Sequence, residues 1–235
     1  MQPLSYQPLE RLRVPRPVNR SAFIIDRCRG RRVLDLGCYD ETALVKVDAG
    51  EWLHGQIARV ATSVTGVDNS AGLPPEGIAT GPTSRIIRGD VTALVGVLPP
   101  GEQPDVIVAG ELIEHLPDPG AFLAQIKAEF PGREFIATTP NATQLSNVLL
   151  GLAARESNHR DHVAVFSFKT LTTLCTRAGF EEWRLIPYHV RYTEMALRNR
   201  GPRRAMVQTA QKLIAGAEWA FPMMSSGYVI FVSKV

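Results

Sequence analysis

The stretch RRVLDLGCYD, residues 31–40, decides the fold expected for this chain of 235 residues. Its apolar run is short enough for a buried strand, and it ends at a glycine, which allows the chain to turn sharply. Apolar segments of the same length recur downstream, and helical segments separate them. Strands that alternate with helices predict an α/β fold, with a mostly parallel sheet and helices on both of its faces.

The pattern predicts a definite set of elements. Strands are expected at residues 31–37, 63–68, 84–90, 105–110, 134–139, 181–190 and 227–235. Helices are expected at residues 19–29, 91–98, 117–130, 167–180 and 204–221. The Gly/Pro-rich segment 72–82 is expected to be a loop. The last two strands are expected to pair antiparallel at an edge of the sheet.

The chain is expected to divide into an arm and one domain. Residues 1–18 are rich in proline and predict an extended N-terminal arm. Residues 19–235 form the domain, in which residues 141–165 and 192–222 are expected to act as lid or cap inserts over a site.

Composition excludes several classes of protein. Hydrophobic residues make up 45% and charged residues 21%, which is typical of a globular domain. The net charge of +3 is too small to indicate nucleic-acid binding by itself. No apolar run is long enough for a membrane span. The three cysteines are widely spaced, which favours a reducing, cytoplasmic location.

Three acidic residues stand at or near the ends of the first three parallel strands: Asp35, Asp68 and Asp90. Ligands of open α/β sheets bind at the carboxyl ends of the strands, where the strand order reverses. A carboxylate after the second strand can accept hydrogen bonds from ribose hydroxyls, and one after the third can accept from an adenine amino group. The ordered set predicts a nucleoside-containing ligand.

Several motifs together resemble the class I S-adenosylmethionine-dependent methyltransferases. They are VLDLGCYD (33–40), TGVDNS (65–70), RGDV (88–91), DVIVAGELIEHLPDPGAFL (105–123), TTPN (138–141), HVAVFSFKTLTTLCTRAGF (162–180) and GYVIFVSKV (227–235). The resemblance implies a Rossmann-like, seven-stranded sheet with an antiparallel last strand. It also implies S-adenosylmethionine as cofactor and S-adenosylhomocysteine as product. The implied cofactor contacts are Asp35, Gly37, Cys38, Asp40, Asp68, Asn69, Asp90, Val91 and Glu111.

The glycine loop departs from the pattern of the family. A further glycine is usual where Asp40 stands, so that GCYD contains only Gly37. Tyr39 and Asp40 could crowd the methionine end of the cofactor, or Asp40 could bind its amino group. A NAD site would need G-x-G-x-x-G, which this loop lacks. A module that keeps the fold without activity is the alternative that the altered loop favours.

The segment that follows the fourth strand, ELIEH, is expected to face the methyl acceptor. His115 is a candidate general base, and Glu114 is expected to orient it. The alternative is that this segment only begins the next helix. His162 is expected to contact the acceptor or to pack the loop over the site. Tyr188, near the other rim, could stack on a sugar ring or be buried in the edge strand.

A divalent metal is not expected, although one set of residues has the required chemistry. Glu111, Glu114, His115 and His162 combine carboxylates with imidazoles. This pattern is similar to that of small-RNA 2′-O-methyltransferases, which bind a metal with E-x-x-E-H and a later D-H. The segment VAVFS (163–167) lacks the aromatic and acidic continuation of those enzymes.

The expected activity is therefore O-methylation of a small-molecule, sugar or glycan hydroxyl, in natural-product or polysaccharide biosynthesis. Three alternatives stay open: metal-assisted methylation of RNA, amine N-methylation, and a catalytically inactive cofactor-binding module. Nucleic acid is not an expected partner, and a homodimer is a reasonable expectation.

Overall fold

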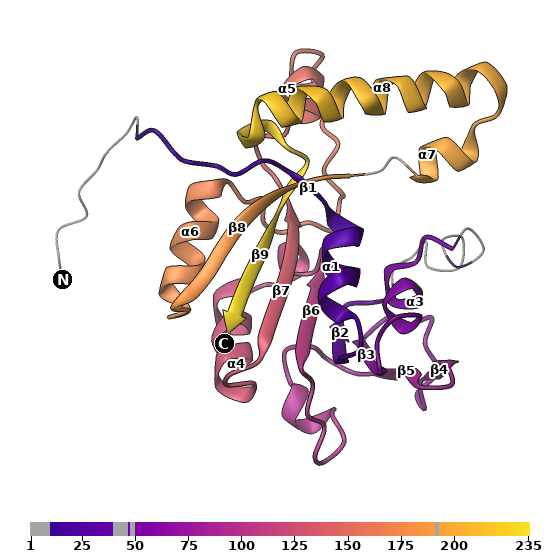
Figure 1. The fold of residues 1–235 in the computed structure, drawn as a ribbon, viewed down its shortest axis with the longest axis vertical. Helices are drawn as coiled ribbons and strands as arrows, with labels where there is room; N and C mark the ends of the chain where they lie inside the picture. Colours follow the sequence, from indigo (N-terminus) through magenta and orange to yellow (C-terminus); the bar gives the residue numbers. More distant parts are fainter. Residues whose placement is uncertain (1–9, 40–46, 48–49, 191–192) are drawn as a thin grey trace.

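The computed structural model describes residues 10–39, 47, 50–190 and 193–235. These residues build one sheet in the order β1-β8-β9-β7-β6-β2-β3-β5-β4 (Figure 1). Its strands are β1 (Val18–Asn19), β2 (Arg32–Leu36), β3 (Ser63–Asp68), β4 (Ile78–Gly81), β5 (Ser84–Arg88), β6 (Val106–Gly110), β7 (Glu134–Pro140), β8 (Glu182–His189) and β9 (Gly227–Lys234).

Pairing within the sheet sets the place of a ligand site. β2 lies at the centre and runs parallel to both β3 and β6. The chain builds outward from β2 through β3 to β5 and then returns to place β6 on the other side of β2. This reversal is a topological switch point, and the crevice at the carboxyl ends of β2 and β6 is where such folds bind ligands.

The expected strands are all present, and β9 is antiparallel to both β7 and β8. Because β9 lies between these two strands, it is inside the sheet and not at its edge. The expected total of seven is wrong, since nine strands form in the described residues. The first addition, β1, contributes two residues beside β8.

The second additional strand, β4, falls in the segment that its glycines and prolines predict to be a loop. It pairs antiparallel with β5 across a register shift. Gly77 makes the close approach possible, because a Cβ there would lie 2.2 Å from the carbonyl oxygen of Ile86. Gly77 indicates a loop in the sequence, but in the structure it allows the edge strand β4 to form.

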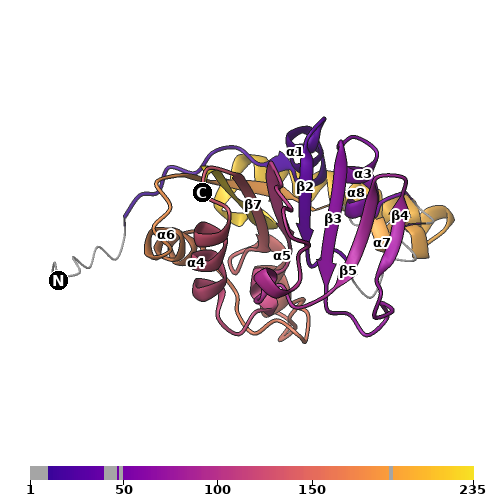
Figure 2. The same ribbon diagram turned by 90° about the horizontal axis from the view of Figure 1, so that it is seen from below.

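Helices cover both faces of the sheet (Figure 2). They are α1 (Arg20–Cys28), α3 (Leu53–Ala58), α4 (Pro119–Glu129), α5 (Leu145–Gly151), α6 (Phe168–Arg177), α7 (Thr193–Arg198) and α8 (Gly201–Ala220), with the short 3₁₀ turns η1 (Leu94–Gly96), η2 (Ile113–His115) and η3 (Pro222–Met224). α7 was not expected, and the helix predicted at 91–98 is only the turn η1.

Local capping explains where two of the helices begin. The side chain of Asn19 accepts a hydrogen bond from the backbone N–H of Ala22 at the start of α1. Ser167 and Thr170 exchange side-chain and backbone hydrogen bonds in a capping box at the start of α6. Both features agree with the boundaries that the sequence predicts.

The apolar core has two layers, one on each face of the sheet. Ile24 and Ile57, from α1 and α3, pack with one face. Phe122 and Leu171, from α4 and α6, pack with the other. The sheet is therefore buried on both sides, and its strand ends are left for a site.

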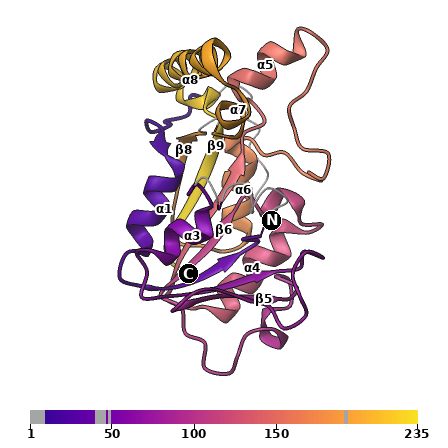
Figure 3. The ribbon, with the colours of Figure 1, turned by 90° about the vertical axis from the view of Figure 1, so that its right-hand side faces the viewer.

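Beyond the carboxyl ends of β7 and β8, the helices α5, α7 and α8 gather at one end of the molecule (Figure 3). Glu218 of α8 is buried, accepts a 2.6 Å hydrogen bond from the hydroxyl of Ser226 and pairs with His189. The guanidinium of Arg16 lies 4.2 Å from the ring centroid of Trp219. The described part of the N-terminal arm thus packs against α8. No helix in the described ranges has the length and apolar character that a bilayer crossing requires.

Candidate functional site

The ends of three neighbouring strands meet through backbone hydrogen bonds. The N–H of Gly37, after β2, donates to the carbonyl of Val67 at 2.9 Å. The N–H of Tyr39 donates to Asp68 Oδ2 at 2.8 Å. The N–H of Gly89, after β5, donates to the carbonyl of Asp68 at 3.0 Å. The predicted cofactor residues of these strands therefore share one edge of the sheet.

Gly37 occupies a position that only glycine can fill without strain. Its φ is +67°, in the left-handed region. A Cβ there would lie 2.8 Å from Cδ1 of Leu112, which follows β6. The loop after β2 therefore comes close to the segment after β6, at the switch point. The approach of a ligand to this turn, which the sequence predicts, stays a prediction.

Asp68 ends β3 and organises the turn around it. Its side chain is only 8% exposed, and Oδ1 accepts a 2.8 Å hydrogen bond from the N–H of Ser70. With Tyr39 on Oδ2, both oxygens are engaged by backbone amides. A carboxylate at the end of this strand is the type of group that can accept hydrogen bonds from a diol. Asn69, beside it, is exposed.

Asp90 and Val91 end the third parallel strand differently. Asp90 is exposed, and its Oδ1 accepts hydrogen bonds from the N–H and the hydroxyl of Thr92 at 2.8 and 2.7 Å. These hydrogen bonds lower the pKa of Asp90 and hold it ionised. Val91 is buried in the core beside it.

Asp35, predicted to contact the cofactor, has an internal partner. Its side chain is 2% exposed, and Oδ2 lies 3.0 Å from Nδ1 of His54 on α3. Asp40 lies outside the described residues. Cys38 lies close to both Asp35 and His54. One carboxylate oxygen of Asp35, the sulfur of Cys38 and one ring nitrogen of His54 lie within 4.8 Å of one another.

Glu111 is held in a strained conformation at the end of β6. Its φ is +56°, which is rare for a residue with a side chain. The hydroxyl of Tyr188 donates to Oε1 at 3.0 Å, and Arg20 Nη1 lies 3.3 Å from Oε2. Arg20 also donates from Nε to Thr138 Oγ1 at 3.0 Å. Strain held this firmly is typical of functional sites.

Arg20 and Tyr188 are site-supporting residues that the sequence analysis did not identify. Arg20 was not singled out in the sequence, and Tyr188 was expected either to stack on a sugar ring or to be buried in the edge strand. Tyr188 is fully buried in β8, and its hydroxyl donates a hydrogen bond to Glu111. The pairing of β1 with β8 places Arg20 beside Tyr188, and no local sequence pattern predicts that pairing.

Glu114 is buried without a polar partner. It is 1% exposed, and neither carboxyl oxygen has a hydrogen-bond partner among the described residues. Burial, and secondarily the negative charge of Glu111, raises the pKa of Glu114 to about 8. The carboxyl does not orient His115, contrary to expectation. Both residues belong to η2, and their ligand atoms lie within 4.8 Å of each other, but no hydrogen bond joins them in the described structure.

The imidazole of His115 is oriented instead by a backbone carbonyl. Its Nδ1 lies 3.2 Å from the oxygen of Asp161, which can only accept, so Nδ1 carries the proton. His162 lies beside it, with ring centroids 4.7 Å apart, and His159 is 6.2 Å away. Burial, and then the nearby His115 and His159, lowers the pKa of His162. The predicted acceptor-side residues are therefore brought together.

Stability should depend on the ionisation of Glu114. Between pH 4.5 and about 8 the unfolded carboxyl is ionised and the folded one is protonated, so the free energy of unfolding falls as pH rises. At about 1.4 kcal/mol per pKa unit, the rise from 4.5 to about 8 corresponds to at most about 5 kcal/mol. Glu114→Gln should flatten this slope in urea unfolding at pH 5 and pH 8.5.

The exposed Glu181 offers the matched control, and Glu181→Gln should keep the slope of the unmodified protein. Equal slopes in the Glu114→Gln variant and the unmodified protein would contradict the buried, protonated carboxyl.

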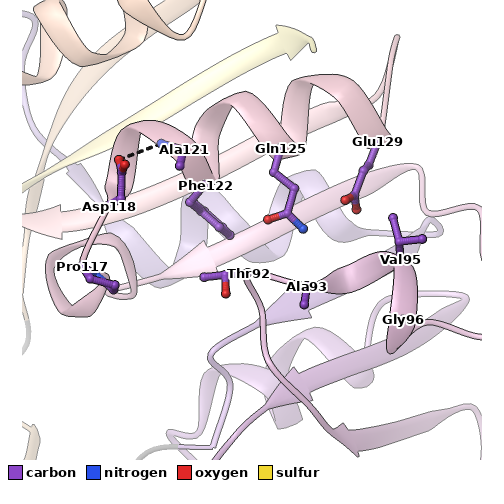
Figure 4. Close-up of a pocket in the computed structure, with 10 residues that line it drawn as sticks. All are labelled: Thr92, Ala93, Val95, Gly96, Pro117, Asp118, Ala121, Phe122, Gln125 and Glu129. Carbon is purple, nitrogen blue, oxygen red and sulfur yellow. Dashed lines mark hydrogen bonds between the residues drawn. The ribbon is translucent and has the colours of Figure 1, made fainter.

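A hollow of about 680 Å³ lies between α4 and the segment 92–96 (Figure 4). Phe122, Gln125 and Glu129 of α4 line this hollow. None of the predicted site residues lines it. We therefore place the candidate site at the strand ends, where the acidic and histidine side chains gather.

Comparisons with known proteins show the family and the fold of the chain. Residues 10–185 match a family model described as a methyltransferase domain. No curated protein sequence matches the chain. A SAM-dependent methyltransferase structure from Archaeoglobus fulgidus is 16% identical, with a TM-score of 0.54, over 91% of this chain and 90% of that one.

Two further structures have the same fold over part of a longer chain. Phosphoethanolamine N-methyltransferase 2 of Haemonchus contortus, in complex with S-adenosyl-L-methionine, is 14% identical with a TM-score of 0.53, over 92% of this chain and 52% of that one. The small RNA methyltransferase HEN1 is 13% identical with a TM-score of 0.55, over 91% of this chain and 24% of that one.

Proposed function

Because the chain belongs to this methyltransferase-domain family, we propose that it transfers a methyl group from S-adenosylmethionine to a hydroxyl of a small molecule, sugar or glycan. Use of S-adenosylmethionine follows from the family. The choice of a hydroxyl acceptor rests on the residues that gather after β6. The observation that carries it is the orientation of His115 by the carbonyl of Asp161.

The residues at the strand ends fit the cofactor. The carboxylate of Asp68 stands at the end of β3, where it would accept hydrogen bonds from ribose hydroxyls. The positive φ of Gly37 lets the backbone approach the ligand closely. Glu111, held by Arg20 and Tyr188, presents a carboxylate at the end of β6. Asp90 and Val91 would lie toward the adenine.

The cofactor supplies a methyl group on a sulfonium, which is a good leaving group. The protein then has two tasks: to align the acceptor in line with the methyl group, and to accept its proton. His115 suits the second task. Since Nδ1–H is committed to Asp161, Nε2 keeps a lone pair that can take a hydroxyl proton. His162, with its lowered pKa, stays neutral beside it.

Methyl transfer from ¹³C-labelled S-adenosylmethionine to a panel of sugars, phenols and primary amines tests the acceptor class. The methyl carbon of the product distinguishes an ether from a methylamine by its NMR shift. We expect ethers. Exclusive labelling of amines would overturn the hydroxyl assignment and leave the family assignment intact.

Metal-assisted methylation of an RNA 2′-hydroxyl is a second candidate that one observation favours. Ligand atoms of Glu114, His115 and His162 lie within 4.8 Å of one another, and the Glu114 oxygens are unpartnered in the described structure. Carboxylate and imidazole donors suit Mg²⁺, Mn²⁺ or another borderline cation. These residues would hold the ion, which would polarise the acceptor hydroxyl.

Removal of metal separates the two candidates. If His115 acts as the base, turnover with a hydroxyl acceptor should be the same, within twofold, with and without EDTA. Titration with Mg²⁺ or Mn²⁺ should not change it. Loss of activity in EDTA that is restored by either ion would contradict the metal-free proposal and support the second candidate.

A further inference from the structure

We propose that Trp52 and His54 are positioning residues that fix the shape of the cofactor loop, Gly37–Cys38–Tyr39. The inference rests on the proposed use of S-adenosylmethionine. It answers the question that the sequence raises, which is how a loop with a single glycine holds the conformation that a ligand needs. Both residues come from the start of α3, which packs beside the loop.

The indole of Trp52 contacts both the backbone and a side chain of the loop. The indole Nε1–H donates to the carbonyl of Cys38 at 2.8 Å. The ring of Tyr39 meets the indole edge-on, with centroids 6.4 Å apart and planes at 84°. From the other side, Asp68 accepts from the N–H of Tyr39 at 2.8 Å. Two consecutive residues of the loop are therefore fixed between α3 and the end of β3.

His54 is buried and contacts the indole of Trp52. It is 1% exposed, with Nδ1 3.0 Å from Asp35 Oδ2 and Nε2 2.9 Å from Thr80 Oγ1. Its ring also packs on the indole of Trp52, with centroids 4.8 Å apart. The imidazole thus links β2 to β4 beneath the indole. Asp35, predicted to touch the cofactor, is assigned here to holding the loop through His54.

The neighbouring strand leaves space for this packing. Gly66 lies in the middle of β3, where a glycine weakens a strand and often marks the close approach of another group. A Cβ at Gly66 would lie 2.6 Å from the sulfur of Cys38 and 3.1 Å from Cε1 of His54. The loop and the imidazole occupy the volume that a side chain would otherwise fill.

Trp52→Phe is the variant that tests the proposal. It keeps an aromatic ring near Tyr39 and His54 and removes the N–H to Cys38, together with the volume of the second ring of the indole. Loss of one hydrogen bond of ordinary strength should raise the Kd for S-adenosylhomocysteine by about three- to tenfold. The KM for S-adenosylmethionine should rise equally, while kcat at saturating cofactor and the Tm stay unchanged. Trp219→Phe, on the exposed side of α8, is the matched control and should change none of these.

His54→Gln provides a second variant, since an amide keeps one polar partner for Asp35. It should also raise KM for the cofactor more than it lowers kcat, whereas a purely structural role would lower Tm and kcat together. An unchanged Kd in Trp52→Phe, with intact binding by the unmodified protein, would overturn the inference. Failure of the unmodified protein to bind S-adenosylhomocysteine would instead refute the function on which the inference rests.

Discussion

Replacing His115 with alanine should lower turnover with a hydroxyl acceptor by about two to four orders of magnitude, the usual contribution of a positioned general base. Binding of S-adenosylhomocysteine should stay within twofold, because His115 contacts the loop around Asp161 and not the residues that we propose for the cofactor. The loss should therefore appear in kcat with the KM for cofactor unchanged. Single-turnover kinetics and calorimetry on the same preparation measure both quantities.

His159 provides the matched control for this experiment. Its ring is in the same cluster, 6.2 Å from His115, and it belongs to the same loop as Asp161. His159→Ala should keep turnover close to that of the unmodified protein. Full turnover in His115→Ala, or an equal loss in both variants, would contradict the role of His115 as the base.

Replacing Asp68 with alanine should weaken binding of S-adenosylhomocysteine by about 10- to 150-fold. The estimate takes about 1.5–3 kcal/mol for hydrogen bonds to a charged group, at about 1.4 kcal/mol per tenfold change. The variant removes the acceptor that we propose for the ribose hydroxyls and also releases the N–H groups of Tyr39 and Ser70. Both consequences act on the cofactor site.

Asp68→Asn separates these two contributions. The amide keeps one acceptor oxygen and the shape of the side chain but loses the charge, so its Kd should lie between those of the alanine variant and the unmodified protein. Calorimetric titration gives the affinities, and thermal unfolding checks that both variants fold. Unchanged affinity in Asp68→Ala would remove this residue from the cofactor site.

The sequence predicts most of the fold because the elements of this chain are marked locally. Short apolar runs mark the strands, and Asn19 and Ser167 mark helix starts by capping chemistry. The antiparallel β9 follows from the family resemblance. The edge strand β4 could not be predicted, because Gly77 indicates a loop until its close approach to β5 is known.

The sequence places several polar residues at strand ends, but it does not predict the direction in which each side chain points. Asp35 and Asp68 both end strands, yet one turns inward to His54 and the other stays at the sheet edge. Glu114 and His115 are adjacent in the turn η2, yet the carboxyl of Glu114 makes no hydrogen bond in the described structure, whereas Nδ1 of His115 lies 3.2 Å from the carbonyl oxygen of Asp161. Arg20 and Tyr188 support Glu111 from distant parts of the chain. Side-chain rotamers and contacts between distant parts of the chain depend on tertiary packing, so local sequence patterns do not predict them.

Isothermal titration of the full chain with S-adenosylhomocysteine, with EDTA and with added Mg²⁺ or Mn²⁺, is the most direct test of the central claim. We expect one site with micromolar affinity that is the same in all three conditions. That result would agree with a cofactor loop held in a binding-competent shape despite its single glycine. Absence of binding in every condition would contradict the account and identify the chain as a module that keeps the fold without the cofactor.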